Sequence, residues 1–485
     1  MTRTGSQYRH SLGSDRSVFI NGERVEDVVT HRAFSRAVDS IAALYDLSND
    51  PATQSLVTYP SPKTGEPVNV AYMIPRSEKD LEHRRNGLRA WSESTFGLMG
   101  RSPDHVAGFL AGFAASPGLF EDVNKEHADN LLRFYEFARD EDLYVTYVIV
   151  PPQIDRSQPA HKQQDPFLYA GVKEERDDGI VITGAQMLGT AAAISDWILL
   201  SCIVPLGAGD ERYANTLVVP LNAPGLKIYA RRSYAEAASS VFDYPLASSY
   251  DESDALVVFD DVFVPWENVF VYQNLELVRD QWWKTPAHVL GNSQAQIRLW
   301  TKLDFLLGIA KAIAEMNGSI KAPPVQALLG ELASYVTQVR SLVLAQEANA
   351  KIDENGVLWP GVEEVHACSA IQSELYPRMI GMIRELGGGG LIQLPSSRDD
   401  YMNAEVSADI ERFIQSPGYS SRERVKLLKL AWDILGSEFA GRQLQYELFY
   451  AGAPHLVKAR VFHNFDFGPS DALLKDALAR YDLET

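Results

Sequence analysis

Short runs of β-branched and aromatic residues between positions 143 and 275 constrain the fold more than any other feature of the sequence. Gly, Pro and Asp separate them at regular intervals, and the runs are DLYVTYVIVPP, DGIVITGAQ, SDWILLSCIVP, NTLVVPLNAPGLKIYA and DALVVFDDVFVP. Closely spaced strands are typical of an all-β sandwich or barrel, whereas βαβ units need a helix between successive strands. Residues 143–275 are therefore predicted to form a β domain.

Both flanks of this block carry helical periodicity. Phe34, Val38, Ile41 and Tyr45 are spaced by four, three and four residues, which places them on one helix face. Two longer seams with the same alternation are Val325, Leu329, Leu332, Val336, Val339 and Val343, and then Val425, Leu428, Trp432, Leu435 and Phe439. GGGG at 387–390 separates the two seams, and Ser420 with Glu423 has the pattern of a capping box.

The order of these blocks predicts a multidomain α+β protein. We expect a helical N-terminal domain over residues 1–142, the β domain over 143–275, and a C-terminal four-helix bundle over 276–485. Helices with strong apolar seams often pack against copies of themselves, so a homo-oligomer is expected.

Charge and cysteine content narrow the function. The 485 residues include 45 Lys and Arg against 64 Asp and Glu, a net charge of −19, which disfavours nucleic acid and anionic membranes as partners. Cys202 and Cys368 are too few for a disulfide scaffold, a cysteine zinc site or an all-cysteine iron–sulfur cluster. Free thiols, the lack of an apolar signal segment and the lack of an apolar run of roughly 18 residues predict a cytoplasmic protein.

The usual catalytic motifs are missing. The sequence has no HExxH, GxSxG, CxxC or strand-linked GxGxxG, and GAQMLGT at 184–190 lacks the lysine of a phosphate-binding loop. The ten histidines are scattered without metal-ligand spacing. These absences disfavour a metal enzyme, a serine hydrolase and a Rossmann dehydrogenase, and we predict no metal.

The segment GRSPDH at 100–105 is the most informative for chemistry. Ser102 suits an N-cap, Pro103 the first helical position and Asp104 the first turn, so a well-capped helix explains the pattern. Alternatively, Arg101 and His105 crowd a helix N-terminus, where a guanidinium, unpaired N–H groups and the helix dipole together stabilise an anion.

Two further segments have the same two interpretations. Residues 146–157 run from a strand into a proline-stiffened polar loop, and residues 285–292 carry His288. By local pattern alone, the first is an ordinary strand end and the second a structural histidine.

Several long motifs carry a resemblance to a known family: NGERVEDVVTHRAF, SIAALYDL, GRSPDH, PPQIDRS, YAEAASSVFDYPLASSYDESDALVVFDDVFVPWENVFVY, HVLGN and KLAWDILGSEFAGRQLQYELFYAG. Over nearly its full length the chain resembles the oxygenase component of two-component 4-hydroxyphenylacetate 3-monooxygenases. The resemblance implies an acyl-CoA-dehydrogenase-like fold, a homotetramer, and FAD that a separate NAD(P)H:flavin reductase supplies in reduced form. It also implies ortho hydroxylation of a phenolic small molecule by O2 through a flavin C4a-hydroperoxide.

The resemblance also assigns roles to residues of the three segments. The substrate-binding candidates are Arg101, Ser102, Pro103, Asp104, His105 and Tyr147. The catalytic candidates are Arg101, His105, Tyr147 and His288. The family usually has Tyr where this chain has His105 and His where it has Tyr147, so the two residue types are exchanged and the exact substrate stays open.

The flavin-binding candidates lie on the strand, the loop after it and two later segments. They are Tyr147, Val148, Ile149, Gln153, Ile154, Asp155, Arg156, Thr190, Phe449, Tyr450 and Ala451. The resemblance further implies that the loop Ser201–Asn215 covers the substrate, although a solvent-exposed hairpin fits that segment equally well.

Hydroxylation of a phenol gives a role to an arginine in the site, because the reacting form of the substrate is an anion. A phenolate is a far better carbon nucleophile than a phenol, whose ordinary pKa is about 10. Arg101 at a helix N-terminus would favour the anion by opposite charge and hydrogen bonding, and His105 or Tyr147 would accept or relay the proton.

Three alternatives remain open. An acyl-CoA dehydrogenase would oxidise its substrate without O2. A related radical dehydratase would need three cysteines and a histidine for its cluster, but this chain keeps only His288 and has Arg101, His105 and Ala295 at the cysteine positions. A catalytically silent flavin-binding subunit is compatible with the exchanged residues. The substrate could be a free phenolic acid, an amino-acid-derived, halogenated or nitrated phenol, or one tethered to a carrier protein.

Overall fold

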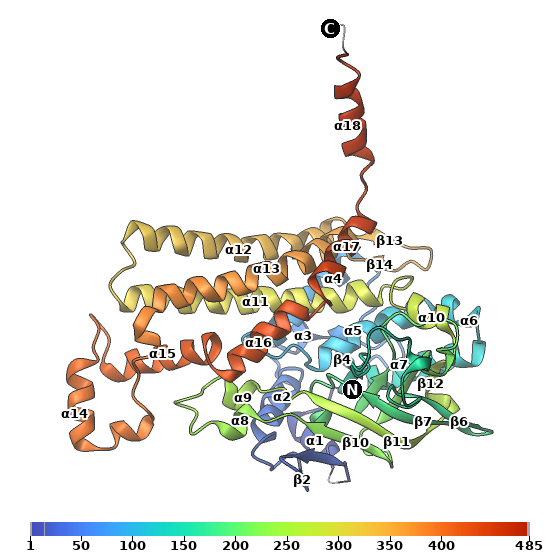
Figure 1. The fold of residues 1–485 in the computed structure, drawn as a ribbon, viewed down its shortest axis with the longest axis horizontal. Helices are drawn as coiled ribbons and strands as arrows, with labels where there is room; N and C mark the ends of the chain where they lie inside the picture. Colours follow the sequence, from blue (N-terminus) through green and yellow to red (C-terminus); the bar gives the residue numbers. More distant parts are fainter. Residues whose placement is uncertain (1, 14, 483–485) are drawn as a thin grey trace.

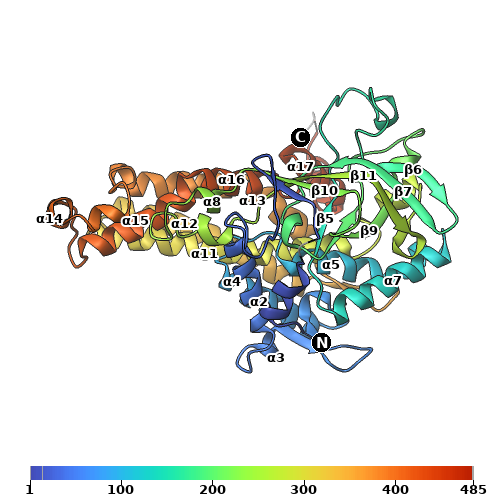
Figure 2. The ribbon, with the colours of Figure 1, turned by 90° about the horizontal axis from the view of Figure 1, so that it is seen from below.

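The computed structural model describes residues 2–13 and 15–482. N-terminal helices, a β-rich middle region and long C-terminal helices follow one another along the chain (Figure 1). A view turned by 90° shows the long helices extending away from the β region, with the N-terminal helices along one side (Figure 2).

The N-terminal region is mainly helical. Its helices are α1 (Gly5–Ser11), α2 (Ser35–Leu47), α3 (Gln54–Val57), α4 (Glu78–Ser94), α5 (Pro103–Ala114), α6 (Pro117–Glu121) and α7 (Lys125–Asp140). The predicted amphipathic helix is confirmed as α2, because Phe34 is its N-cap and Val38, Ile41 and Tyr45 are buried. A short hairpin is formed by β3 (Thr58–Pro60) and β4 (Pro67–Asn69).

Two sheets make up the β region. The six-stranded sheet has the order β2 (Glu23–Arg24), β1 (Val18–Ile20), β10 (Leu226–Ala230), β11 (Ala255–Pro265), β7 (Gly179–Gln186) and β6 (Gly171–Arg176). The four-stranded sheet has the order β12 (Val269–Val271), β9 (Thr216–Pro220), β8 (Trp197–Leu200) and β5 (Val145–Val148). Buried Val, Ile and Leu side chains of both sheets share one core with α2, so sheets and N-terminal helices form a continuous body.

One feature of the larger sheet departs from the sequence-based division. Strand β1 pairs in parallel with β10, with Val18 opposite Ile228, so the N-terminal region supplies two strands to this sheet. Such short strands carry too few residues for a periodicity signal. The boundary between residues 142 and 143 therefore stays a prediction.

Long helices dominate the C-terminal region. Short helices α8 (Tyr234–Ala237), α9 (Ala247–Tyr250) and α10 (Leu275–Asp280) precede it. The long ones are α11 (Ala287–Met316), α12 (Pro323–Ala348), α13 (Val362–Gly387), α15 (Ser421–Leu435) and α16 (Glu438–Phe449). A hairpin of β13 (Lys351–Ile352) and β14 (Leu358–Trp359) connects α12 to α13, and the shorter helix α14 (Ala404–Phe413) lies between α13 and α15. The helix α13 ends at Gly387 of the GGGG segment, as expected, and the Ser420–Glu423 capping box begins α15.

The second predicted seam is divided between two helices. Its last member, Phe439, lies in α16, because α15 ends at Leu435 and Gly436 follows. A Cβ at position 436 would overlap the ring of Trp432, so the close approach of that ring requires glycine and permits the bend.

The chain ends in two helices, α17 (Pro454–Asn464) and α18 (Gly468–Leu478). Helix α17 packs against α13, whereas α18 has no buried residue and projects away from the body (Figure 1). No helix within residues 2–13 and 15–482 is both long enough and apolar enough to cross a membrane.

A buried ion cluster fixes α16 against the bundle. Glu447 of α16 accepts hydrogen bonds from Arg298 at 2.8 and 2.9 Å and from Lys302 at 2.7 Å, both on α11. Gln372 of α13 donates a further hydrogen bond to Glu447 at 2.7 Å. The side chains of Glu447, Arg298 and Lys302 are at most 1% exposed, so each charge depends on its partners instead of on water.

Removing this carboxylate should therefore be costly. We expect Glu447→Ala to lower the free energy of unfolding by about 3–5 kcal/mol, because it leaves two buried cations unpaired. The measurement is urea-induced unfolding followed by fluorescence. Glu438→Ala, which removes an exposed carboxylate from the same helix, is the control and should cost less than about 1 kcal/mol. Equal losses in the two variants would contradict this account.

Candidate active site

The N-terminus of α5 is built as the sequence predicts, but its polar side chains face inward. Ser102 is the N-cap and Pro103 the first helical residue, and every residue of α5 is buried. The Ser102 hydroxyl makes no capping bond to the backbone and instead donates to the Asp104 carboxylate at 2.5 Å. The helix start therefore carries a buried polar cluster on the side of α11.

Arg101 lies at the centre of an aromatic cage. Its guanidinium carbon is 5.1 Å from the ring centroid of Tyr147, 5.2 Å from that of Tyr446 and 5.0 Å from that of Tyr450. Arg101 Nη1 donates to the Tyr446 hydroxyl at 2.9 Å, which is the only side-chain hydrogen bond recorded for this guanidinium within the described chain. A Cβ at Gly100 would overlap that hydroxyl, so the approach of Tyr446 requires glycine there. Four of the five guanidinium N–H groups remain available for a ligand.

His105 and Tyr147 meet beside this cage. Their ring centroids are 5.5 Å apart, and His105 Nε2 lies 3.5 Å from the Tyr147 hydroxyl. His105 is fully buried, and this burial, followed by the nearby positive charge of Arg101, lowers the pKa of His105 well below its ordinary value. The imidazole is thus neutral and the arginine carries the positive charge of the site. The structure brings Arg101, His105 and Tyr147 together although 46 positions separate the first from the last.

The predicted loop after β5 is open to solvent. Val148 and Ile149 are buried at the end of the strand, whereas Gln153, Ile154, Asp155 and Arg156 are exposed. Among the candidates on α16 and just after it, Phe449 is 49% exposed and Tyr450 belongs to the cage around Arg101; Ala451 follows in a turn.

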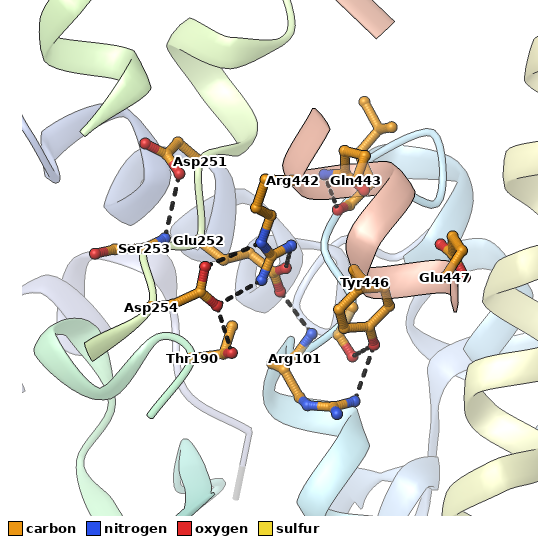
Figure 3. Close-up of polar contacts among 12 residues, drawn as sticks. Arg101, Thr190, Asp251, Glu252, Ser253, Asp254, Arg442, Gln443, Tyr446 and Glu447 are labelled. Atoms are coloured by element: carbon orange, nitrogen blue, oxygen red, sulfur yellow. Dashed lines mark hydrogen bonds and ion pairs between the residues drawn. The ribbon is translucent and has the colours of Figure 1, made fainter. Parts of the chain in front are cut away.

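Thr190 belongs to a buried polar network that links the β region to α16 (Figure 3). Its hydroxyl donates to Asp254 at 2.7 Å, and Asp254 also pairs with Arg442 of α16 at 2.8 Å. Arg442 further pairs with Glu252 at 3.0 Å, and Glu252 accepts the backbone N–H of Arg101 at 2.5 Å. Although burial opposes it, the positive charge of Arg442 holds the pKa of Asp254 well below its ordinary value.

These network residues were missed by the sequence reasoning. Glu252, Asp254 and Arg442 lie inside motifs that carried the resemblance, but nothing in their local pattern distinguishes them from surface charges. What sets them apart is that Arg442 pairs with Glu252 and Asp254, which lie 190 and 188 positions away in the sequence, and no local pattern reveals a contact of that range. A cavity of about 370 Å³ is lined partly by Gly209, Glu211 and Arg212 of the loop Ser201–Asn215, and another of about 220 Å³ lies between Tyr234 and Phe439; neither is lined by Arg101, His105 or Tyr147.

Comparison with known proteins identifies the family. Profiles described as 4-hydroxyphenylacetate 3-hydroxylase N terminal and C terminal match residues 4–271 and 278–479. The 4-hydroxyphenylacetate 3-monooxygenase oxygenase component of Thermus thermophilus is 33% identical over 99% of each chain.

The chain belongs to the 4-hydroxyphenylacetate 3-hydroxylase family.

Other members of the family act on different phenols. A Streptomyces globisporus monooxygenase, named for a 3-chloro-4-hydroxyphenyl substrate on a peptidyl-carrier protein, is 34% identical over 93% of this chain and 85% of its own. A crystal structure of a 4-hydroxyphenylacetate 3-monooxygenase oxygenase component with FAD and 4-hydroxyphenylacetate superimposes with a TM-score of 0.93 at 33% identity, covering 99% of this chain and 100% of that one. A 4-hydroxybutyryl-CoA dehydratase from N. maritimus superimposes with a TM-score of 0.90 at 21% identity over 99% of this chain and 96% of its own, and the expected acyl-CoA-dehydrogenase-like fold is confirmed.

His288 does not join the other catalytic candidates. Its Nε2 lies 3.0 Å from Nε2 of His366 on α13, and its Nδ1 lies 3.0 Å from the Asn292 amide. Both ring nitrogens therefore have partners within the bundle, and no contact with Arg101 or Tyr147 is recorded in the described chain. Burial lowers the pKa of His288 well below its ordinary value and that of His366 to about 4.

This histidine pair predicts a pH dependence of stability. Both imidazoles stay neutral in the folded protein at pH values where the unfolded chain already binds protons. The free energy of unfolding should therefore fall as the pH drops below about 6.5, the ordinary histidine value, and His366→Gln should make that fall shallower. Urea midpoints measured across this pH range test the point, with exposed His10→Gln as the control. The same slope in His366→Gln and the wild type would refute the assignment.

Proposed function

We propose that this chain is the oxygenase component of a two-component flavin-dependent monooxygenase that hydroxylates a phenol ortho to its hydroxyl group. The observation that carries the proposal is the meeting of a charged arginine with unused N–H donors, a neutral buried histidine and a tyrosine hydroxyl: Arg101, His105 and Tyr147. A phenol oxygen is the group that can use all three at once.

The chain's own residues prepare the substrate. Arg101 donates hydrogen bonds to the phenol oxygen and stabilises its negative charge, which acts strongly because the aromatic cage excludes water. His105 takes the proton, directly or relayed through the Tyr147 hydroxyl. Each unit by which the pKa of the bound phenol falls corresponds to about 1.4 kcal/mol of preference for the phenolate. The ring carbon ortho to the oxygen is then electron-rich.

Exposed residues on segments that adjoin the end of β5 support a flavin site. Ile154, Leu188 and Ile203 are about half exposed, at 46, 53 and 46%. The segments that carry Leu188 and Ile203 lie beside the end of β5, because the backbone N–H groups of Met187 and Ile203 donate to the carbonyl oxygens of Val150 and Ile149. These exposed apolar side chains would form the apolar part of a flavin surface, and the exposed polar candidates Gln153 and Arg156 suit the polar edge of an isoalloxazine ring. When bound, reduced FAD would supply the activated oxygen.

The substrate class remains broader than one compound. The Thermus relative is named for 4-hydroxyphenylacetate and the Streptomyces relative for a carrier-bound phenol. Both names describe a para-substituted phenol, and we propose a substrate of that class for this chain. The loop Ser201–Asn215 is proposed to cover it.

The oxygenase needs partners. We propose a separate NAD(P)H:flavin reductase and a homo-oligomer, with a tetramer expected from the family. The exposed apolar side chains of the C-terminal tail support self-association: Phe465, Phe467, Leu473, Leu474 and Leu478 are 42–74% exposed. A cytoplasmic location and the domain roles, flavin and substrate in 143–275 and self-association and flavin in 276–485, remain parts of this proposal.

The proposal is tested with FAD reduced anaerobically, mixed with the protein, O2 and a panel of para-substituted phenols. We expect a product heavier by one oxygen atom, and Arg101→Ala should lower the rate of its formation by about 100- to 1000-fold while changing FAD affinity little. Arg101→Lys keeps the positive charge but loses the planar guanidinium, so its rate of product formation should lie between those of the wild type and Arg101→Ala. Flavin binding without any hydroxylated product would favour a silent subunit, and equal loss of flavin affinity and rate would remove Arg101 from the substrate site.

The tail is tested separately. Deleting residues 465–485 should lower the oligomer mass measured by sedimentation equilibrium, because the exposed apolar side chains of α18 would no longer reach another copy. Sedimentation of the full chain at matched concentration is the control. An unchanged mass would show that the tail does not hold the oligomer together.

A further inference from the structure

His105 ends a chain of buried hydrogen bonds that the proposed mechanism does not use. The Ser102 hydroxyl donates to Asp104 Oδ1 at 2.5 Å, and Gln294 Nε2 donates to Asp104 Oδ2 at 3.0 Å. The other end of the same amide, Gln294 Oε1, lies 3.0 Å from His105 Nδ1. Gln294 comes from α11, 189 positions away from His105, so two helices build this chain.

Donor and acceptor chemistry fixes the direction of each bond. Burial raises the pKa of Asp104, whereas the hydrogen bonds that Ser102 and Gln294 donate to it favour its ionised form. An ionised carboxylate only accepts, so the amide nitrogen of Gln294 faces Asp104 and its oxygen faces His105. An amide oxygen also only accepts, so His105 Nδ1 must carry the hydrogen. In a neutral imidazole the other nitrogen then has a free lone pair. His105 Nε2 is therefore an acceptor, and it faces the Tyr147 hydroxyl at 3.5 Å.

Burial makes this arrangement specific. Ser102, Asp104, His105 and Gln294 are between 0 and 7% exposed, so bulk water does not substitute for a missing partner. The charged and titratable groups around His105 are Arg101, Arg298, Tyr147 and Tyr450. None of these is a carboxylate that would hold the imidazole as a cation. The Tyr147 contact is at the long limit of a hydrogen bond, so a substrate hydroxyl can replace it.

We propose that Gln294, oriented by Asp104, is a positioning residue that holds His105 in the Nδ1–H tautomer, so that its Nε2 receives the proton of the phenolic substrate. The inference rests on the proposed function. The phenol O–H bond breaks, an Nε2–H bond forms, and the phenolate stays paired with Arg101.

The first test reads the tautomer directly and needs no substrate. Imidazole ¹⁵N signals of histidine-labelled protein separate a protonated from a bare nitrogen, and His105→Gln identifies the His105 signals by their loss. We expect a protonated Nδ1 and a bare Nε2 in the wild type, and a mixture of tautomers in Gln294→Leu. A protonated Nε2 in the wild type, or an unchanged tautomer in Gln294→Leu, would overturn the inference.

The matched control is Gln296→Leu, the same substitution two residues along α11. Gln296 is equally buried, but it donates to the Val365 carbonyl and the Ser369 hydroxyl on α13. A general loosening of α11 would change both variants alike, whereas the proposed role changes only Gln294→Leu.

The second test uses 4-nitrophenol, whose anion absorbs at longer wavelength than its neutral form. Gln294→Leu should lower the ionisation constant of the bound probe by about three- to tenfold, the contribution of one buried hydrogen bond, and Gln296→Leu should not. If the wild type ionises the probe and Arg101→Ala abolishes this while Gln294→Leu equals its control, the inference fails and the proposed function stands. If the wild type does not ionise the probe, the proposed function fails, and the ¹⁵N spectra still decide the tautomer.

Discussion

Buried ion pairs on α16 hold together the parts of the chain that meet at the site. Glu447 joins this helix to α11, and Arg442 joins it to Glu252 and Asp254 of the β region. Glu252 in turn accepts the backbone N–H of Arg101. Charges this deeply buried are stable only when every partner is present, so the position of α16 is strictly determined. Its Tyr446 then has little freedom beside the Arg101 guanidinium.

This constraint separates two tasks within a small volume. The carboxylates bind the helix, through Arg442, Arg298 and Lys302, and none of them accepts a recorded hydrogen bond from the Arg101 guanidinium, although the charge of Glu252 favours its cation. Arg101 is instead surrounded by aromatic rings, and most of its N–H donors have no recorded acceptor. A neutral histidine beside a charged arginine suits a group that gives up a proton and keeps the negative charge.

The sequence allowed the local features to be predicted and left the long-range ones open. The N-cap at Ser102, the face of α2 and the β character of the middle region follow from patterns within a few residues. The roles of Gln294 and Glu447 do not, because buried polar contacts between positions 149 to 189 residues apart leave no periodicity. The resemblance named most of the residues around Arg101, but placed His288 among the catalytic candidates, whereas its recorded partners lie within the helical bundle.

The central claim is that a phenol oxygen is held between Arg101 and His105. The most direct measurement is a crystal structure of the protein with a bound para-substituted phenol. The account predicts the phenol oxygen within hydrogen-bond distance, about 2.6–3.2 Å, of both a guanidinium nitrogen of Arg101 and Nε2 of His105. A phenol bound with its hydroxyl group away from both side chains would contradict it.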